Sequence, residues 1–406
     1  MHMHHNTIIP GLEGVIITNS EVVEGIWKLS VEVPKCRQKC PCCGNRTNRV
    51  HDYRIQKIKH LKVFERMTIM YYRRRRYSCK CGKRFSEKTS FIERYQRHSV
   101  EWNQAVALRV VKGKTFKETA EIFGTSSSTI MRRFDTMAAP QLKEVRELPP
   151  VIAIDEYKGD TSEGKFQVII ADPVNRQPLD ILPNRKMETV KNYLHKKGGK
   201  VEVVVMDMSN SFKSAVTKAL GKPVIVADRF HYCRYIYWAL ERVRRSVQNE
   251  FDDYNRKKCK RMKHVFYKKK ENLSEVQRWY LDRYLSMSDE LCEAYDLKEL
   301  FCEWLEKAKE IGSSNISYVK ETLYEFYRKV EASNIDAFKS AIQTFRNWQP
   351  EIFNSFAFGY TNGFIEGLNN QTKVFKRNAF GFKRYDRFRM RILLHHQWKH
   401  IPAHIG

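Results

Sequence analysis

Two aspartates far apart in the sequence occupy positions where they could hold metal ions. Asp155 follows the apolar run VIAI and Asp207 follows VEVVVM, so each lies at or beside the end of a strand-like segment. A carboxylate is costly in an apolar strand, and two facing carboxylates repel each other unless a cation neutralises them. Carboxylate oxygens suit Mg²⁺ or Mn²⁺. The alternative is that each aspartate only caps the helix after it.

A third acid, Glu366, lies in TNGFIEGLNNQTKVFKR, just upstream of many Lys, Arg and Asn residues. At helical period it shares one face with polar and basic side chains, namely Asn362, Asn370, Lys373 and Arg377. A second, apolar face is expected to pack on a sheet and comprises Phe364, Leu368 and Phe375. Cations and amides suit a phosphodiester, and paired metals about 3.5 to 4 Å apart can clamp its attacking and leaving oxygens. The alternative is a surface Glu in a helical charge pattern.

The segment around the two aspartates predicts an α/β sheet. Five β-rich runs are expected, over residues 151–157, 166–173, 177–184, 201–209 and 223–231. Amphipathic stretches precede the fourth and fifth runs, so the order is β-β-β-α-β-α-β. This is the order of a ribonuclease-H-like sheet, in which the first and fourth strands are neighbours. Asp155 and Asp207 are therefore expected to face each other, with Asp228 beside the end of the fifth strand.

The rest of the chain predicts a multidomain organisation. Residues 233–350 are basic, helical in pattern and poor in strand signals, which indicates an α-helical insertion into the sheet domain. The expected division has five parts: strands and a zinc ribbon over 1–95, a helix-turn-helix over 96–148, the first part of the core over 149–232, the insertion over 233–350, and the second part of the core over 351–406.

Two close cysteine pairs, each followed by Gly, predict a structural zinc site. Strand-like sequence separates KCPCCGN from SCKCGK, as in a zinc ribbon, and four thiolates make a tetrahedral Zn²⁺ centre. The glycines permit the sharp reversal at each turn. The chosen ligands are Cys40, Cys43, Cys79 and Cys81, with Cys36 and Cys42 as spare candidates, because the second pair is Cys-x-Cys. The alternative is a group of free or buried thiols.

Residues 115–134, TFKETAEIFGTSSSTIMRRF, predict a helix-turn-helix. Ala120 allows two helices to approach closely, Gly124 makes the turn, and Ile130 anchors the second helix in a core. The polar face of that helix could enter a major groove, and its expected DNA-binding residues are Ser127, Ser128, Thr129, Arg132 and Arg133. The alternative is an ordinary helical hairpin.

The charge balance points to a polyanionic partner. The chain has 406 residues with 74 Lys+Arg against 46 Asp+Glu, a net charge of +28. Nucleic acid is the leading partner, although a membrane-surface or ribosome-associated protein could share this charge. No apolar run is long enough to span a membrane, and the start MHMHHNTIIP lacks the order of a signal peptide. We therefore expect a soluble, intracellular protein.

Together these motifs resemble a known family. CPCCG, CKCGKRFSE, the helix-turn-helix, IDEY, MDMSNSF, ADRFHYCR and TNGFIEGLNNQTKVFKRNAFGF occur in the order found in the ISL-three family of insertion-sequence DDE transposases. The resemblance covers almost the whole chain. It implies a ribonuclease-H-like core interrupted by a helical domain, with Asp155, Asp207 and Glu366 at the DDE positions. Asp228 and His231 match a family motif and are accessory candidates, with Asp228 the alternative second metal ligand.

The resemblance implies a Mg²⁺-dependent enzyme that binds the terminal repeats of its element, cuts at the ends and joins them to target DNA. Bringing two DNA ends together implies a homodimer or a larger assembly. Two other hypotheses remain: a structure-selective nuclease on the same fold, and a zinc-ribbon DNA-binding regulator without catalysis. The helix-turn-helix disfavours the first, because such a nuclease has less need of sequence readout. The intact acidic trio disfavours the second.

Overall fold

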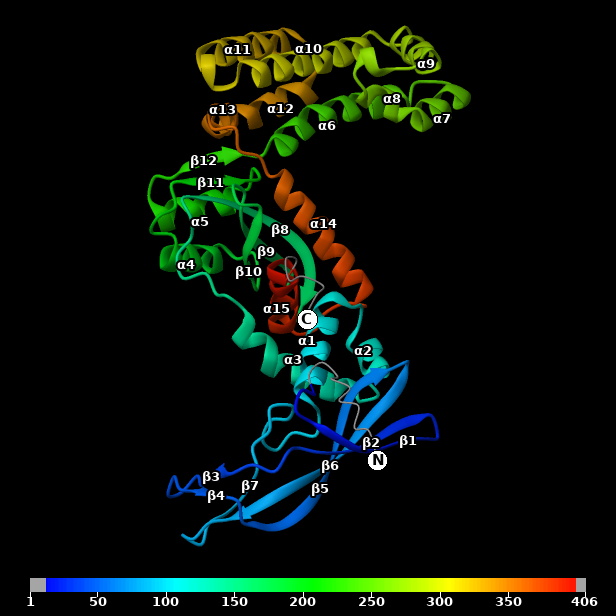
Figure 1. The fold of residues 1–406 in the computed structure, drawn as a ribbon. Helices are drawn as coiled ribbons and strands as arrows, with labels where there is room; N and C mark the ends of the chain where they lie inside the picture. The colour runs from blue at the N-terminus through cyan, green and yellow to red at the C-terminus, as the bar shows by residue number, and fades with distance from the viewer. Residues whose placement is uncertain (1–11, 399–406) are drawn as a thin grey trace. The chain divides into compact units, whose positions relative to one another are not determined.

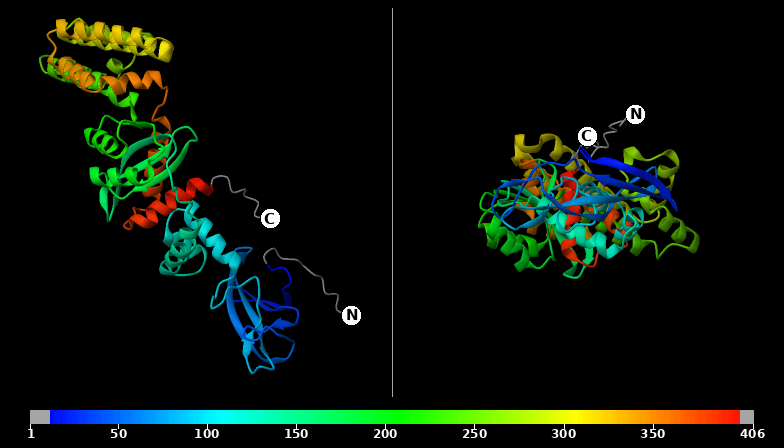
Figure 2. Two further views of the ribbon diagram at one scale, coloured as in Figure 1. Left: turned by 90° about the vertical axis from the view of Figure 1, so that its left-hand side faces the viewer. Right: turned by 60° about the horizontal axis from the view of Figure 1, so that its bottom comes forward.

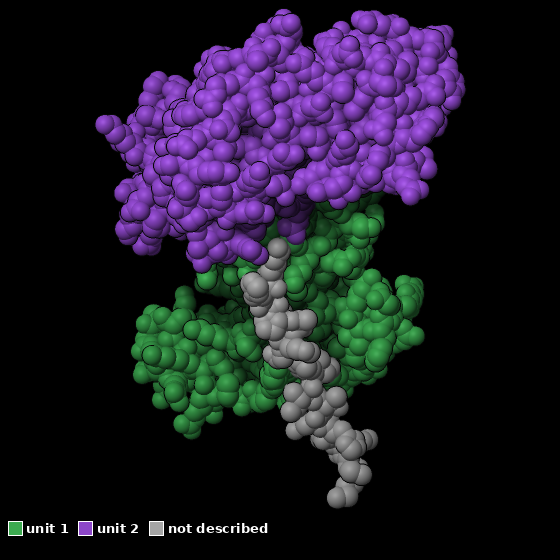
Figure 3. Space-filling view, turned by 90° about the horizontal axis from the view of Figure 1, so that it is seen from above, with its two compact units in different colours: residues 1–143, 374–406 green, residues 144–373 purple. Residues whose placement is uncertain are grey.

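The computed structural model describes residues 12–398 and divides into two compact units, coloured separately in Figure 3. One unit comprises residues 1–143 and 374–406, and the other comprises residues 144–373. The histidine cluster at the start of the sequence lies outside the described residues. Across residues 12–398, no helix has the length and apolar character needed to cross a membrane.

The first unit begins with a sheet built around a long hairpin, labelled β5 and β6 in Figure 1. The strand order is β1-β2-β6-β5, and β7 pairs with β6. Alternate side chains of the sheet, including Leu29, Ile58 and Tyr72, form its core. The strands are β1 (Ile16–Val23), β2 (Ile26–Glu32), β5 (Val50–Val63), β6 (Arg66–Ser78) and β7 (Arg84–Ser86), with a separate pair β3 (Gln38–Lys39) and β4 (Arg46–Thr47).

The same unit contains a small helical bundle. Its helices are α1 (Val100–Lys112), α2 (Phe116–Ile122), α3 (Ser127–Gln141) and α15 (Tyr385–Gln397). Trp102, Phe134 and Leu394 belong to one core, so α15 packs with α1 and α3 although it is distant in sequence. The sequence-based division assigned 351–406 to the catalytic core, and the structure differs for α15. The apolar residues of RFRMRILL, residues 387–394, predict a buried helix face but not the unit in which that face is buried.

The second unit contains the predicted α/β sheet. Its strands run in the order β10-β9-β8-β11-β12, with β8 and β11 parallel neighbours, as expected. The elements are β8 (Val151–Thr161), β9 (Gly164–Asp172), β10 (Gln177–Leu182), α4 (Met187–Lys197), β11 (Val203–Met206), α5 (Asn210–Leu220) and β12 (Val224–Ala227). Ribonuclease-H-like order and the fold class predicted from the sequence are therefore confirmed in this sheet.

Both faces of this sheet are buried in the region of β11, and helices α4 and α5 pack on one of them. Ile154 and Met206 on one face share a core with Phe212 of α5 and Leu194 of α4. Because side chains alternate along a strand, Ala153 and Val205 belong to the opposite face. The strand β11 is buried along its whole length, which requires cover on both faces.

A helical insertion follows β12 and shares the core of the sheet. Helix α6 (Arg229–Val247) leaves the end of β12 and runs into a layer of helices, as Figures 1 and 2 show. Contacts of α12 with α6 and of α13 with β12 close the insertion back onto the sheet. The remaining elements are α7 (Asp253–Arg261), α8 (Lys263–Tyr267), η1 (Lys270–Asn272), α9 (Glu275–Leu285), α10 (Asp289–Ile311), η2 (Gly312–Asn315), α11 (Ile316–Ala332), α12 (Asp336–Asn347) and α13 (Gln349–Ala357).

Helix α14 (Gly363–Asn378) brings the third predicted acid back to the sheet. Its buried side chains are Ile365, Leu368, Asn369 and Thr372. The expected packing face of Phe364, Leu368 and Phe375 is therefore only partly right, because Phe364 and Phe375 are half-buried. Two polar residues, Asn369 and Thr372, lie on the buried face where apolar periodicity alone could not identify them.

Candidate active site and zinc centre

Three aspartates lie in one row across three parallel strands. The register pairs Ile154 of β8 with Met206 of β11, and Met206 with Ala227 of β12. The next residue in each strand direction is an aspartate: Asp155, Asp207 and Asp228. Asp207 and Asp228 directly follow their strands, whereas Asp155 lies inside β8, which continues to Thr161. The expectation that Asp155 lies near a strand end is thus wrong for β8 itself, although Asp155 lies beside the end of β11.

The row is electrostatically unfavourable without a cation. Burial and, to a lesser extent, the charge of Asp207 raise the pKa of Asp155 to about 6, although a hydrogen bond from the backbone N–H of Glu156 acts in the opposite direction. Burial also raises the pKa of Asp207. Oδ1 of Asp207 is buried and has no hydrogen-bond partner among the described residues. A carboxylate oxygen without a partner, next to a second carboxylate, fits a divalent cation.

Asp228 and His231 form a pair at the end of the row. Asp228 is the N-cap residue of α6, and its Oδ2 lies 2.9 Å from Nδ1 of His231. Burial would lower the pKa of His231, but the hydrogen bond and charge of Asp228 outweigh it and raise that pKa. Asp228 is engaged by this imidazole, whereas Oδ1 of Asp207 has no partner among the described residues. The two arrangements favour Asp207 over Asp228 as the metal ligand.

Helix α14 contacts the row through an amide that sequence reasoning missed. Nδ2 of Asn369 donates to Oδ2 of Asp155 at 2.6 Å, across 214 residues of sequence. Figure 1 shows α14 passing beside β8, in agreement with this hydrogen bond. Asn362, two turns earlier, is also buried, and its side chain has no hydrogen-bond partner within residues 12–398. The GLNN motif offered two asparagines, Asn369 and Asn370, without indicating which one faces Asp155.

Glu366 lies on the same helix, three residues before Asn369, and is exposed. Its carboxylate is not part of a tight ligand group with the aspartates. Within residues 12–398, the four cysteines are the only set of three or more His, Cys, Asp or Glu residues whose ligand atoms all lie within 4.8 Å of one another. The structure therefore brings Asp155, Asp207, Asp228 and His231 together and leaves Glu366 on the adjoining helix. Asn370, Lys373 and Arg377 are exposed on α14, as expected for DNA contacts.

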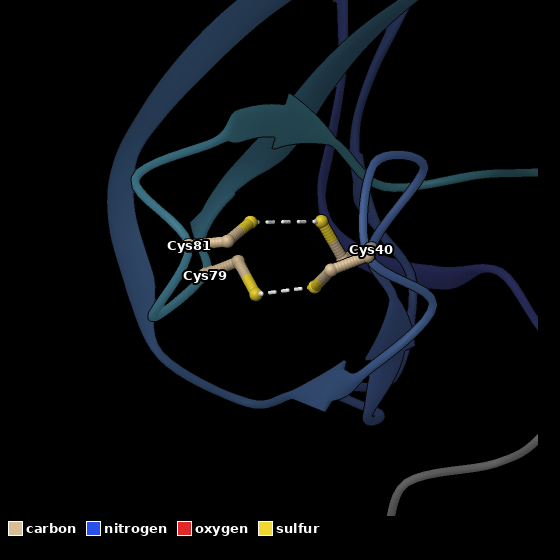
Figure 4. Close-up of side chains that lie close together, drawn as sticks. Cys40, Cys79 and Cys81 are labelled. Carbon is tan, nitrogen blue, oxygen red and sulfur yellow. Dashed lines mark hydrogen bonds between the residues drawn. The ribbon is translucent and has the colours of Figure 1, made fainter.

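The four cysteines chosen as zinc ligands come together between two turns (Figure 4). The Sγ atoms of Cys40 and Cys81 lie 3.7 Å apart, and those of Cys43 and Cys79 lie 3.5 Å apart. A tetrahedron with Zn–S bonds of about 2.3 Å has sulfur atoms about 3.8 Å apart, so these distances fit. Gly44 and Gly82 have φ of +75° and +82°, which is the conformation that each turn requires.

The thiols favour a bound cation. The backbone N–H of Cys43 lowers the pKa of Cys40 to about 7. For Cys43 the N–H of Asn45 acts in the same direction, but hydrogen bonds with the thiols of Cys79 and Cys81 outweigh it and raise its pKa to about 11. Four thiolates cannot share this space without a positive ion, which Zn²⁺ would supply. Cys36 and Cys42 are exposed and lie outside the group.

The predicted helix-turn-helix is formed by α2 and α3. Ala120 and Ile130 are buried in the bundle core, and Gly124 turns the chain with φ of +60°. The Oγ of Ser126 accepts from the N–H of Thr129 and caps α3. Of the expected DNA-binding residues, Ser128 and Arg132 are exposed, and Ser127, Thr129 and Arg133 are half-buried. The first two stand one helical turn apart on the outer face of α3.

A basic groove beside α3 was not predicted. It has a volume of about 710 Å³ and is lined by cations of β5 and its neighbouring loop together with the start of α3; these residues include Lys57, Lys59, Arg97, Thr125 and Thr129. Nζ of Lys59 donates to the carbonyl oxygen of Gly124 at 2.7 Å. The alternation of KIKH could have predicted part of this groove, because it places Lys57 and Lys59 on one face of β5.

The zinc-ribbon turns, the helix-turn-helix and the acidic row define a DNA-binding protein with a metal-dependent nuclease-like core. Three family models match in the same order. "Zinc-finger of transposase IS204/IS1001/IS1096/IS1165" matches residues 37–82, "Helix-turn-helix domain of transposase family ISL3" matches 87–137, and the ISL3 "Transposase" DDE model matches 152–392. The chain belongs to the ISL3 family of DDE transposases.

Two curated proteins illustrate the range of similarity. The "Transposase for insertion sequence element IS1001" of Bordetella parapertussis is 24% identical over 367 residues, which cover 87% of each chain. A protein of Lactococcus lactis subsp. lactis named "ATP-dependent protease" is 37% identical over 81 residues, only 19% of this chain and 26% of its own. The first match extends over the zinc, helix-turn-helix and catalytic regions together, whereas the second spans a short segment.

Proposed function

We propose that this transposase cuts DNA at the ends of its own insertion sequence and joins the freed ends to a target. The observation that carries the proposal is the register that sets Asp155 beside Asp207, whose buried Oδ1 has no hydrogen-bond partner among the described residues. In the first step water attacks the phosphodiester at the element end and leaves a 3′-hydroxyl. In the second step this hydroxyl attacks a target phosphodiester, and the 3′ oxygen of the target strand departs.

Asp155, Asp207 and Glu366 are the proposed metal ligands and catalytic residues. Two divalent ions, Mg²⁺ or Mn²⁺, would activate the attacking oxygen and stabilise the leaving oxygen. Asp155 and Asp207 offer carboxylate oxygens from a rigid sheet, which fixes their separation. Asn369 donates to one oxygen of Asp155 and orients the other. At the end of the row, Asp228 is paired with the imidazole of His231.

Glu366 supplies its carboxylate from α14 rather than from the sheet. Asn369 anchors this helix to Asp155, so Glu366 lies one turn from a residue that touches the row. Its exposure leaves the carboxylate accessible to an incoming ion and phosphate. Asn370, Lys373 and Arg377 follow along the exposed side of the helix and would contact the DNA backbone.

Recognition of the element end is assigned to the first unit. The polar face of α3 would read the major groove, through the exposed Ser128 and Arg132 and the half-buried Ser127 and Arg133. The cations of the groove beside it, Lys59 and Arg97, would hold a phosphate next to the recognition helix. A relative named for one insertion sequence element supports an element-specific target. Because a transposition event brings two ends together, we propose a dimer or larger assembly on DNA.

The test uses purified protein, a labelled duplex with the end of the encoding element, and a target plasmid. With Mg²⁺ we expect nicks at the element boundary and joined plasmid products, and with EDTA neither. Asp155→Asn should lose both products, whereas the control Glu163→Gln, in the exposed turn after β8, should keep them. Cutting without joining would support a nuclease instead, and specific binding without cutting under Mg²⁺ or Mn²⁺ would support a regulator.

A further inference from the structure

Helix α6 carries two large aromatic side chains, Phe230 and Trp238, that lie outside the main core. Its inner side, which includes Tyr232, Ile236 and Leu240, is buried in the main core. Phe230 and Trp238 lie on the outer side and are 58% and 50% exposed. Single exposed apolar residues are common, but these two stand two turns apart on one stripe of a well-packed helix. An aromatic stripe on a rigid support is typical of a binding surface.

An arginine lies between the two rings. The guanidinium carbon of Arg234 is 4.8 Å from the centre of the Phe230 ring and 5.3 Å from that of Trp238. The pattern continues at the same spacing, because Arg242 follows Trp238 by four residues and is exposed. Alternating aromatic and guanidinium groups favour a ligand that is both flat and negatively charged.

The stripe begins at the acidic row. Phe230 is the second residue after Asp228, and its ring centre lies 5.7 Å from that of His231. Asp228 is itself the N-cap residue of α6, so the helix that carries the stripe starts at the last aspartate of the row. A DNA strand with a phosphate at the carboxylates would therefore meet this stripe at its next nucleotides.

We propose that Phe230 and Trp238 form a stacking platform for unpaired bases of the DNA strand held at the acidic row, with Arg234 between them. This inference rests on the proposed function, since it assumes that DNA reaches the carboxylates. Base stacking on aromatic side chains tolerates any sequence, because every base offers a flat face. The stripe would thus hold a strand end apart from its complement during cutting or joining.

The spacing of the rings favours unpaired rather than duplex DNA. Eight helical residues separate Phe230 from Trp238, a rise of about 12 Å along the axis. Bases in a duplex strand are about 3.4 Å apart and are covered on both faces by their neighbours. Two nearby bases can reach both rings only if the strand is extended and unstacked there. A protein partner would also use aromatic residues, but it would gain nothing from the adjacent carboxylate row.

The test measures binding of full-length protein to fluorescein-labelled oligothymidylate and to a duplex of the same length, in EDTA, by anisotropy. Trp238→Ala and Phe230→Ala should each weaken single-strand binding roughly tenfold, with duplex binding changed less than about twofold. Trp238→Phe should retain most of the affinity. The matched control is Trp279→Ala on α9, because Trp279 is 56% exposed and has Arg283 at 5.4 Å.

The control decides what the loss means. If Trp238→Ala and Trp279→Ala behave alike, or if Trp238→Ala weakens duplex and single strand equally, the platform is refuted. A variant that binds single strands normally but loses self-association in sedimentation would assign the stripe to a protein interface and also refute it. Binding in EDTA needs no cleavage, so the two proposals can fail separately. If the protein does not cut or join DNA but its preference for single strands depends on Trp238, the proposed reaction is refuted and the stacking platform is supported.

Discussion

The four-cysteine cluster and the acidic row are two proposed metal sites of opposite construction. The four cysteines come from two short turns, and their sulfur atoms already lie within 4.8 Å of one another. The carboxylates come from two strands and a helix, and Glu366 remains exposed and outside any such group. A closed ligand set suits a metal that holds the fold, whereas an open one leaves room for a substrate oxygen. The comparison indicates a structural role for one metal site and a chemical role for the other.

The largest effect is expected at the zinc centre. Cys79→Ser should abolish bound zinc and unfold the ribbon, because a structural zinc can contribute about 10 kcal/mol to the folding of a small domain. Zinc content by atomic absorption and proteolysis of residues 37–82 would measure this. Cys36→Ser is the matched control and should keep a full zinc content, because Cys36 is exposed outside the group. Equal zinc loss in both variants would contradict the ligand assignment.

Asp155→Asn should have the opposite profile, with a large loss of activity and no loss of stability. Cleavage should fall roughly a thousandfold, since a ligand of the catalytic ions is removed. In EDTA the melting temperature should stay equal or rise, because burial and the charge of Asp207 disfavour the Asp155 carboxylate. Mn²⁺ should raise the melting temperature of the wild type more than that of the variant. A strongly destabilised Asp155→Asn would mean that the residue serves the fold.

A smaller effect is expected at Asn369, which acts through another residue. Asn369→Ala should reduce cleavage about 10- to 100-fold, as removal of a group that orients a metal ligand typically does. The loss should appear in kcat rather than KM, because DNA binding does not use this buried amide. Zinc content should not change. An unchanged kcat would show that the hydrogen bond to Asp155 has no part in catalysis.

The sequence predicted those parts of the sites that depend on local patterns. Apolar alternation and chain order were enough to place β8 beside β11, and therefore Asp155 beside Asp207. The Cys-x-x-Cys and Cys-x-Cys turns identified the sulfur cluster, because each pair depends on a few consecutive residues. Ala120, Gly124 and Ile130 identified the helix-turn-helix for the same reason.

The parts that could not be predicted depend on contacts between distant segments. Nothing within GLNN indicates that Asn369, rather than Asn370, would face Asp155, which lies 214 residues earlier in the sequence. The basic apolar helix α15 could have covered either unit, and Arg387 turned out to pair with Asp135 of α3 at 2.8 and 2.7 Å. The extension of β8 beyond Tyr157 likewise depends on its pairing with β9, because KGDT is a turn-like sequence.

The central claim is that Asp155, Asp207 and Glu366 hold the same metal site once DNA is bound. The most direct measurement replaces Mg²⁺ with Fe²⁺ in the DNA complex and maps the backbone cuts made by locally generated hydroxyl radicals. We expect cuts near residues 155, 207 and 366, reduced by excess Mg²⁺ and lost in Asp155→Asn. Cuts confined to β8 and β11, with α14 intact in the DNA complex, would contradict the assignment of Glu366 to the site.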